Sequence, residues 1–312
     1  MALTADQAQL LALCRIKGTN WYALAREAQR GNNIQRLAGG HLLEASAEAS
    51  ATAEAIRAAA ADLPRLEEEA HREYEKAAVV GAHLVTVLDD DYPATLRLVF
   101  NAPPFLFIRG QLQKDDLRSV AVVGTRQASD AGQRRASRMA RLLVEQGVTV
   151  VSGLARGIDT AAHNAALDAG GRTIAVIGTG IRRCYPAENQ ALAERIVESG
   201  AIVSQFWPDT PPATYTFPRR NVTMSGIAQG TVVIEASSTS GAKMQARLAL
   251  EHGKKAFLLR SLTEEQPWAR RYVEKRGAIL VDDVDDVVRL LVGPDRIEAA
   301  DTRRSQLALQ FE

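Results

Sequence analysis

The sequence contains little cysteine and shows no strong excess of either charge. Its 312 residues include two cysteines, Cys14 and Cys184, which stand far apart with no CxxC spacing. We therefore expect free thiols in a reducing compartment and no metal site. The formal net charge is only +1, which argues against a protein that coats DNA through its overall charge. Any site for a polyanion must then be a local patch.

Long apolar runs and complete nucleotide-binding signatures are also missing. No run approaches the roughly 18 residues of a membrane span, and the N-terminus lacks a signal-peptide pattern, so we expect a cytoplasmic protein with no membrane partner. The absence of a G-x-x-x-x-G-K-[ST] motif argues against an ATPase. The turn after residues 120–123 lacks both the full G-x-G-x-x-G fingerprint and the acidic residue of an NAD site. We therefore expect no cofactor.

The composition is that of an ordinary globular chain, with 46% hydrophobic and 24% charged residues, and the pattern changes twice along it. We expect a helical module and connector over 1–78 and a Rossmann-like domain over 79–292. A flexible polar tail is expected over 293–312, where apolar residues could form a short docking end: Leu307, Leu309 and Phe311.

Residues 4–38 have the pattern of short helices around glycine turns. Thr4 can cap the first helix, and Gln7 three positions later completes a capping box. Helix, glycine turn and helix resemble the small helix-hairpin-helix and SAM-like modules that contact backbones or partner proteins. A packing module without a ligand is the alternative. Residues 42–78 are rich in alanine and glutamate and predict a helical connector that breaks at Pro64.

From His83 onward, short apolar runs alternate with helix-length segments, which include predicted helices near 220–228 and over 264–276. This alternation predicts an α/β fold with a doubly wound, mostly parallel sheet. The turns that follow parallel strands meet at one edge of such a sheet, where helix N-termini can bind phosphate. The predicted parallel strands are 120–123, 148–151, 173–177, 201–204, 231–235, 255–259 and 278–281.

Several of these turns combine small residues, hydroxyls and cations. Backbone N–H groups and hydroxyls bind phosphate oxygens without reading bases, and arginine adds charge-assisted bonds. Phe217 stands beside cations and could stack a base. The residues that we predict to bind DNA or phosphate are Gly124, Thr125, Arg126, Ser152, Gly153, Arg156, Gly178, Gly180, Phe217, Arg219, Arg220, Asn221, Ser240, Gly241 and Lys243.

Four acidic or basic features could be catalytic or structural. Asp159 and His163 share one helix face, but no nucleophile motif accompanies them. We therefore favour structural roles, with Asp159 binding backbone amides and His163 closing the turn. Glu235 lacks the Gly-Gly-x-Gly-Thr-x-x-Glu pattern of sugar-cleaving relatives of this architecture, and is also interpreted as structural. We interpret the acidic run 89–91 as a turn before a proline and not as a metal site, because no further set of metal ligands follows it. We expect a protein that is not an enzyme.

The order of motifs resembles that of the DprA/Smf family of DNA-processing proteins, from about Asp89 to Leu291. SGLARGIDTAAHNAAL at 152–167 is the most specific match, and VAVVGTR, GTGIRRCYPAENQAL and FPRRN stand in the family's order. The resemblance implies a protein that binds single-stranded DNA, forms a homodimer and passes the strand to a RecA-type recombinase in natural transformation or repair.

The sequence departs from the family pattern after Asn221. Residues 222–228 read VTMSGIA where the family usually has Arg-Ile-Ile-Ala-Gly-Leu-Ser, and no winged-helix segment follows the last predicted helix. These departures leave a second hypothesis open: a nucleotide sensor, or an antitoxin that regulates a cognate toxin in phage defence. A third and weaker hypothesis is an N-glycosidase acting through Glu235.

Overall fold

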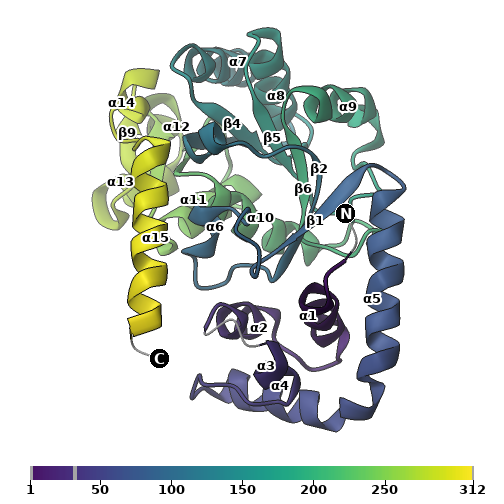
Figure 1. Ribbon diagram of the computed structural model, residues 1–312. Coiled ribbons are helices and arrows are strands. Elements are labelled where there is room, and N and C mark those ends of the chain that lie inside the picture. The colour runs from purple at the N-terminus through teal and green to yellow at the C-terminus, as the bar shows by residue number, and fades with distance from the viewer. Residues whose placement is uncertain (1–2, 31–33, 311–312) are drawn as a thin grey trace.

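The computed structural model describes residues 3–30 and 34–310, except the side chains of 304, 305 and 307–310. Within these residues, nine strands form one sheet in the order β1-β2-β6-β5-β4-β3-β7-β8-β9 (Figure 1). β2 is antiparallel to β1 and to β6, and all the other neighbours are parallel. The strands are β1 (Ala82–Thr86), β2 (Phe105–Gly110), β3 (Ser119–Val123), β4 (Thr149–Ser152), β5 (Thr173–Val176), β6 (Ala201–Ser204), β7 (Gly230–Val233), β8 (Lys255–Leu259) and β9 (Ile279–Val281).

The sheet is wound in both directions from β3, which confirms the predicted doubly wound α/β fold. β4, β5 and β6 follow on one side of β3, and β7, β8 and β9 lie on the other. Helices cover both faces, so the central strands are buried throughout and consist of continuous apolar runs. One face carries α7 (Asp130–Glu145), α8 (Ile158–Asp168) and α9 (Gln190–Ser199), and the other α6 (Ala94–Arg97), α10 (Thr216–Ile227) and α11 (Gly241–Glu251).

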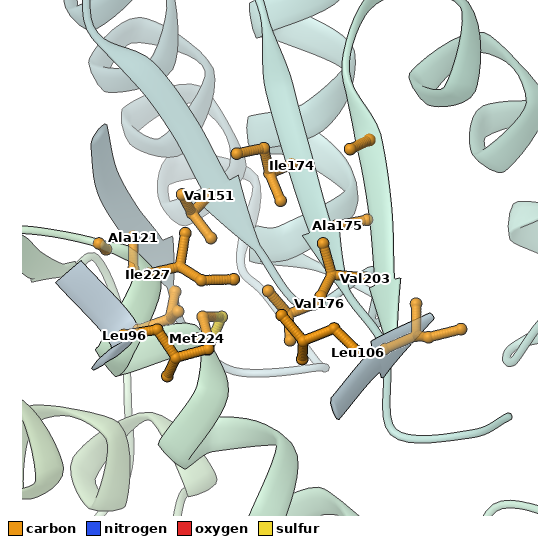
Figure 2. Close-up of a cluster of buried hydrophobic side chains, with 14 of the residues drawn as sticks. Leu96, Leu106, Ala121, Val151, Ile174, Ala175, Val176, Val203, Met224 and Ile227 are labelled. Carbon is orange, nitrogen blue, oxygen red and sulfur yellow. The ribbon is translucent and has the colours of Figure 1, made fainter. Parts of the chain in front are cut away.

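A cluster of buried hydrophobic side chains holds α10 against the sheet. Met224 and Ile227 of α10 point into this core, where both side chains are almost fully buried (Figure 2). Burial of one such side chain contributes roughly 1.5–3 kcal/mol, so the helix and its first turn are held firmly. The facing residues are Leu96 of α6 and Leu106, Val151, Val176 and Val203 of the sheet.

Helices α1 to α4 form a module at one end of the molecule, and α5 runs from it along the side to β1 (Figure 1). Thr4 and Gln7 make the predicted capping box at the start of α1. The break before α5 lies at 59–62, not at Pro64, which occupies the first turn of α5 where its missing N–H costs nothing. The bounds are α1 (Ala5–Arg15), α2 (Trp21–Ala28), α3 (Ile34–Ala38), α4 (Ala47–Ala58), η1 (Ala60–Asp62) and α5 (Leu63–Ala78).

The segment after residue 292 is a helix, α15 (Pro294–Gln310), and not the flexible tail that we predicted. Lys114 binds both Asp295, at 2.8 Å, and Glu298, at 2.7 Å, while Ile297 is buried. These contacts hold the first turns of a helix that its polar composition alone did not indicate. Leu307, Leu309 and Phe311, our docking residues, lie outside the residues whose side chains are described.

Two further predicted helices have different bounds. The predicted helix 264–276 is divided at Gln266, which is extended because the residue before a proline avoids helical backbone angles. The helix that we predicted near 220–228 begins earlier, at Thr216. The remaining elements are η2 (Lys114–Leu117), η3 (Ala187–Asn189), α12 (Arg260–Glu265), α13 (Pro267–Arg276) and α14 (Val284–Val288). Over the described residues, we find neither a helix suited to crossing a bilayer nor a cluster of three metal-ligating side chains.

Candidate polyanion site at the switch in strand order

The strand order reverses at β3, and a cavity of about 450 Å³ opens at this point. In open α/β sheets, ligands bind outside the carboxyl ends of the strands where the order reverses. The cavity is bordered by the turns after β3, β4 and β7 and by the starts of α10 and α11. Its lining includes Gly124, Thr125, Arg126, Ala155, Asp159, Phe217, Arg220, Asn221, Ser240 and Gly241.

The turn after β3 presents Thr125 and Arg126 to this cavity. The Thr125 N–H donates to the Glu235 carbonyl at 2.7 Å, and its carbonyl accepts from Ile158 N at 3.3 Å. Gly124 permits this close approach, because an added Cβ would lie 2.3 Å from Cγ1 of Ile158. Arg126 is exposed, and its guanidinium carbon lies 4.8 Å from the centroid of the Phe217 ring. The turn thus offers a hydroxyl and a cation side by side.

Phe217 links this cation to a second aromatic ring. The centroid of the Tyr185 ring lies 5.9 Å from that of Phe217, and Tyr185 is 42% exposed. Because α10 begins at Thr216, Phe217 stands in its first turn and faces the turn after β3. Our residue-level prediction omitted Tyr185, although it lies within the motif GTGIRRCYPAENQAL. Two rings and one guanidinium therefore form a surface on which a base can stack.

Arg156, after β4, is exposed and paired with a carboxylate. Its Nη2 lies 2.6 Å from an oxygen of Glu188, and its Nε donates to the other oxygen at 2.8 Å. Hydrogen bonding within the pair raises the pKa of Arg156 and lowers that of Glu188. An exposed pair of this kind is weak and screened by salt, so a phosphate group can compete for the arginine.

Arg220 lies beneath the cavity, although we predicted that it would face DNA. It is 6% exposed, and its Nη1 donates to the carbonyls of Gly153 at 2.6 Å and Val176 at 2.7 Å. Burial lowers the pKa of Arg220, and the neighbouring Asp159 opposes this change. Gly153 is needed for packing, because an added Cβ would lie 1.8 Å from Nη1. Arg220 therefore gives the cavity floor a fixed positive charge.

Three residues that we predicted to bind phosphate are packed closely against their neighbours. Ser152 is fully buried, and its hydroxyl donates to the Val122 carbonyl at 2.7 Å. An added Cβ on Gly178 would lie 2.7 Å from Cδ1 of Phe217. On Gly180 the added atom would lie 2.2 Å from the Pro208 carbonyl oxygen. Ser152 and Gly180 thus shape the site from within, whereas Gly178 also lines a small hollow with Arg126, Arg156 and Phe217.

The remaining predicted residues divide between the cavity and its surroundings. Ser240 caps α11 by accepting from Ala242 N, and Gly241 beside it is exposed. Asn221 borders the cavity but is mostly buried beside Arg220. Arg219 and Lys243 do not line the cavity. The Arg219 guanidinium lies 5.6 Å from the Tyr215 ring centroid, and the Lys243 ammonium 5.8 Å from that of Trp268.

Residues 83–292, which include every turn around this cavity, match the model of the DNA recombination-mediator protein A family. The chain belongs to this family. The resemblance noted from the motifs is therefore confirmed. Protein Smf of Escherichia coli is 39% identical over 211 residues, which are 67% of this chain and 56% of the relative. DNA processing protein DprA of Streptococcus pneumoniae is 38% identical over 204 residues, 65% of this chain and 72% of the relative. The chain thus matches little more than half the length of the Escherichia coli protein.

Solved structures of the DNA recombination-mediator protein A family share the fold. The structure of DprA from Streptococcus pneumoniae superposes with a TM-score of 0.70 at 30% identity, over 94% of this chain and 99% of that one. A structure of DNA processing protein A from Helicobacter pylori, reported for its single-stranded DNA binding mode, superposes with a TM-score of 0.59 at 25% identity. The match covers 66% of this chain and 94% of that one. The first of these similarities extends beyond the sheet to nearly the whole chain.

Three polar residues of this family member have structural hydrogen bonds around the cavity. Asp159 accepts from the N–H groups of Gly153, at 3.1 Å, and Ala155, at 3.4 Å, and burial raises its pKa. His163 does not close the turn; its Nδ1 bonds Thr173 Oγ1 of β5 at 2.7 Å. The Glu235 carboxylate accepts from the Ser129 hydroxyl at 2.7 Å and thereby anchors the start of α7.

Proposed function

We propose that the chain binds single-stranded DNA in the cavity at the switch in strand order and acts in DNA processing. The arrangement of Arg126, Phe217 and Tyr185 carries this proposal, because it places a cation over one ring, with a second ring tilted against the first, beside backbone amides and a hydroxyl. The Helicobacter pylori relative is reported to bind single-stranded DNA. Relatives from Streptococcus pneumoniae and Bacillus subtilis are named DNA processing protein DprA. These names do not favour the alternatives of a nucleotide sensor or an antitoxin.

The chemistry of the site suits a backbone followed by unpaired bases. Phosphate oxygens would contact Arg126, the Thr125 hydroxyl and the start of α11, while the buried charge of Arg220 attracts anions from below. An unpaired base would stack on Phe217 or Tyr185, each stacked base contributing roughly 1–3 kcal/mol. Neither contact reads the base edges, so binding should be salt-sensitive and tolerant of sequence.

We further propose that the protein acts by binding and not by catalysis. Hydrogen bonds of Asp159 and Glu235 hold the turn after β4 and the start of α7, and His163 joins α8 to β5. These structural roles do not support the glycosidase hypothesis. A homodimer that delivers the strand to a RecA-type recombinase in the cytoplasm is the proposed setting. The family's description as a recombination mediator supports this setting.

Arg126→Ala tests the proposed site. We expect it to weaken binding of a labelled oligothymidylate by about tenfold to a hundredfold, because a charge-assisted hydrogen bond contributes roughly 1.5–3 kcal/mol. Fluorescence anisotropy at low salt measures the affinity, with duplex and free nucleotides as competitors. The matched control is Arg296→Ala, an exposed arginine on α15, which should bind like the wild type. No binding by the wild-type protein would refute the proposed function.

A further inference from the structure

Tyr215 and Arg219, at the start of α10, form a second pair of an aromatic ring and a cation outside the cavity described above. Tyr215 is 56% exposed, and the guanidinium carbon of Arg219 lies 5.6 Å from the centroid of its ring. We call these two residues the Tyr215 subsite. We infer that the Tyr215 subsite binds the continuation of a single DNA strand held in the cavity, with one base stacked on Tyr215 and a phosphate group bound to Arg219. This inference rests on the proposed function.

The first turn of α10 carries the same combination of ring and guanidinium on two sides. On one side, Phe217 lies against Arg126 and borders the cavity. On the other side, Tyr215 has helical backbone angles and Arg219 follows four positions later, so both side chains share one face of the helix. Only Thr216 separates the two rings in the chain. A strand that leaves Phe217 can therefore reach Tyr215 across a single helical turn.

The ring of Tyr215 is open to an unpaired base. Its hydroxyl makes no hydrogen bond with any described residue, and Arg219 is the cation that lies over the ring. An exposed ring can stack a base of any type, because every base has a π-face. The bases of a duplex are already stacked and paired, so an open ring at this place favours a single strand.

Arg219 is available to a phosphate group. It is exposed, and among the described residues no carboxylate lies within ion-pair distance of its guanidinium. By contrast, Arg182 pairs at 2.6 Å with Asp209, which belongs to the loop that leads to α10. Arg219 can therefore bind a phosphate oxygen without first breaking an ion pair.

The N-terminal module borders the Tyr215 subsite. The ring centroid of Trp21 lies 5.9 Å from that of Trp207, in the loop between β6 and α10. Tyr22, the next residue of α2, is half-buried near Arg219: burial raises the pKa of its hydroxyl, and the positive charge of Arg219 opposes this change. The sequence pattern left open whether this module contacts a ligand or only packs. Its position beside a free cation and an open ring favours contact with DNA.

The first test compares two exposed rings. Tyr215→Ala removes the ring of the subsite. The matched control Phe100→Ala removes a ring that is 59% exposed and lies against His252, just before β8. Fluorescence anisotropy measures binding of a labelled oligothymidylate of about 20 nucleotides, which is longer than the roughly 4–16 that one site covers. We expect Tyr215→Ala to bind about tenfold more weakly, as for the loss of one stacked base, and the control to bind like the wild type.

Two conservative variants separate the ring from the charge. Tyr215→Phe keeps the ring and should bind with the affinity of the wild type. Arg219→Gln keeps a polar side chain but removes one phosphate contact, so the salt dependence of its affinity should be shallower by about 0.7 in slope.

The second test observes stacking directly. The emission of a tryptophan is quenched when its ring stacks on a base, so Tyr215→Trp reports contact at the subsite, and Phe100→Trp is the matched control. The wild type measures the contribution of the three native tryptophans. We expect single-stranded oligothymidylate to quench the emission that Tyr215→Trp adds, and a duplex of the same length to leave it unchanged. The emission added by Phe100→Trp should respond to neither.

Other results would overturn the inference. If Tyr215→Ala binds the oligomer as tightly as a wild type that does bind it, the subsite plays no part and the proposed function stands. Equal quenching by duplex and single strand would show that Tyr215 does not select unpaired bases. If Tyr215→Ala changes only the sedimentation of the protein alone, the ring is a contact between copies of the chain and the inference is wrong. No binding by the wild type overturns the proposed function and the inference with it.

Discussion

At the scale of the residue, Gly153 and Arg220 depend on each other. The Arg220 guanidinium lies where a side chain at position 153 would be, and it donates to the Gly153 carbonyl. Gly153→Ala should displace this buried charge from its two carbonyls and lower the free energy of unfolding by about 2–4 kcal/mol. Urea denaturation measures the change. Gly241→Ala is the matched control, because no described atom lies within 4 Å of the added Cβ, and an unfolding curve shared by both variants would contradict the argument.

The same pair shows how far residue types could predict the site. The glycines, hydroxyls and arginines that follow the strands correctly indicated that the candidate site lies at one edge of the sheet. This was possible because the local sequence pattern determines where each strand ends. Which of these atoms face the cavity depends on partners far away in the chain. Arg220 is held by a carbonyl 67 positions earlier, and Ser152 by one 30 positions earlier, and no local signal records either contact.

At the scale of the element, His163 joins α8 to β5 in a way that should make stability pH-dependent. Thr173 Oγ1 donates to the Val150 carbonyl, so it accepts the Nδ1 proton of His163. Nε2 is buried with no partner among the described residues. A second proton there would have no acceptor among the described residues. Burial, with the nearby positive charge of Arg220, therefore lowers the pKa of His163 to about 3.

The sign of the pH effect follows from this lowered pKa. An unfolded histidine takes up a proton near pH 6.5, while folded His163 does not until about pH 3. Stability should thus be complete above pH 6.5 and fall as the pH drops, by about 2 kcal/mol at pH 5. His163→Asn keeps a donor near Nδ1 and should flatten this fall in denaturation curves measured from pH 7 to 5. The control His71→Asn, at an exposed position of α5, should retain the loss of stability at low pH. Equal pH dependence of stability in the wild type and both variants would refute the role assigned to His163.

Elements were predictable where their own residues determine them. The capping box at Thr4 and the apolar strands are local patterns, and both are present. The bounds that we missed depend on distant contacts or on backbone angles. α15 is tied down by Lys114, nearly 200 residues earlier in the chain, and the helix predicted over 264–276 is interrupted by the extended backbone at Gln266. Composition does not describe a distant ion pair, whereas the extended backbone at Gln266 follows from Pro267 and is a local signal that our prediction overlooked.

At the scale of the whole molecule, the small net charge hides a separation of charge. The edge at the carboxyl ends of the strands carries Arg126 and buried Arg220, and a neighbouring hollow is lined by Lys243, Arg271, Lys275 and Arg276. Near the amino ends, a hollow of about 600 Å³ is lined by Asp90 and Asp91 and by three carboxylates that pair with cations. Asp116 pairs with Arg172, Glu298 with Lys114 and Asp301 with Arg97. The local group of cations at the carboxyl ends can attract a polyanion to that edge, which a net charge of +1 does not reveal.

The N-terminal module is joined to the sheet through Trp21. The ring centroid of Trp21 lies 5.1 Å from that of Phe105 in β2 and 5.9 Å from that of Trp207, and its indole N–H donates to the Cys14 carbonyl at 2.7 Å. Trp21→Ala removes these contacts and should cost about 2–4 kcal/mol, since truncation of a tryptophan in a packed site leaves a cavity. The module should then melt before the sheet in calorimetry. Trp21→Phe, which keeps a ring against Phe105, should retain one transition, and a single unchanged transition in the alanine variant would show that this contact does not couple the two parts.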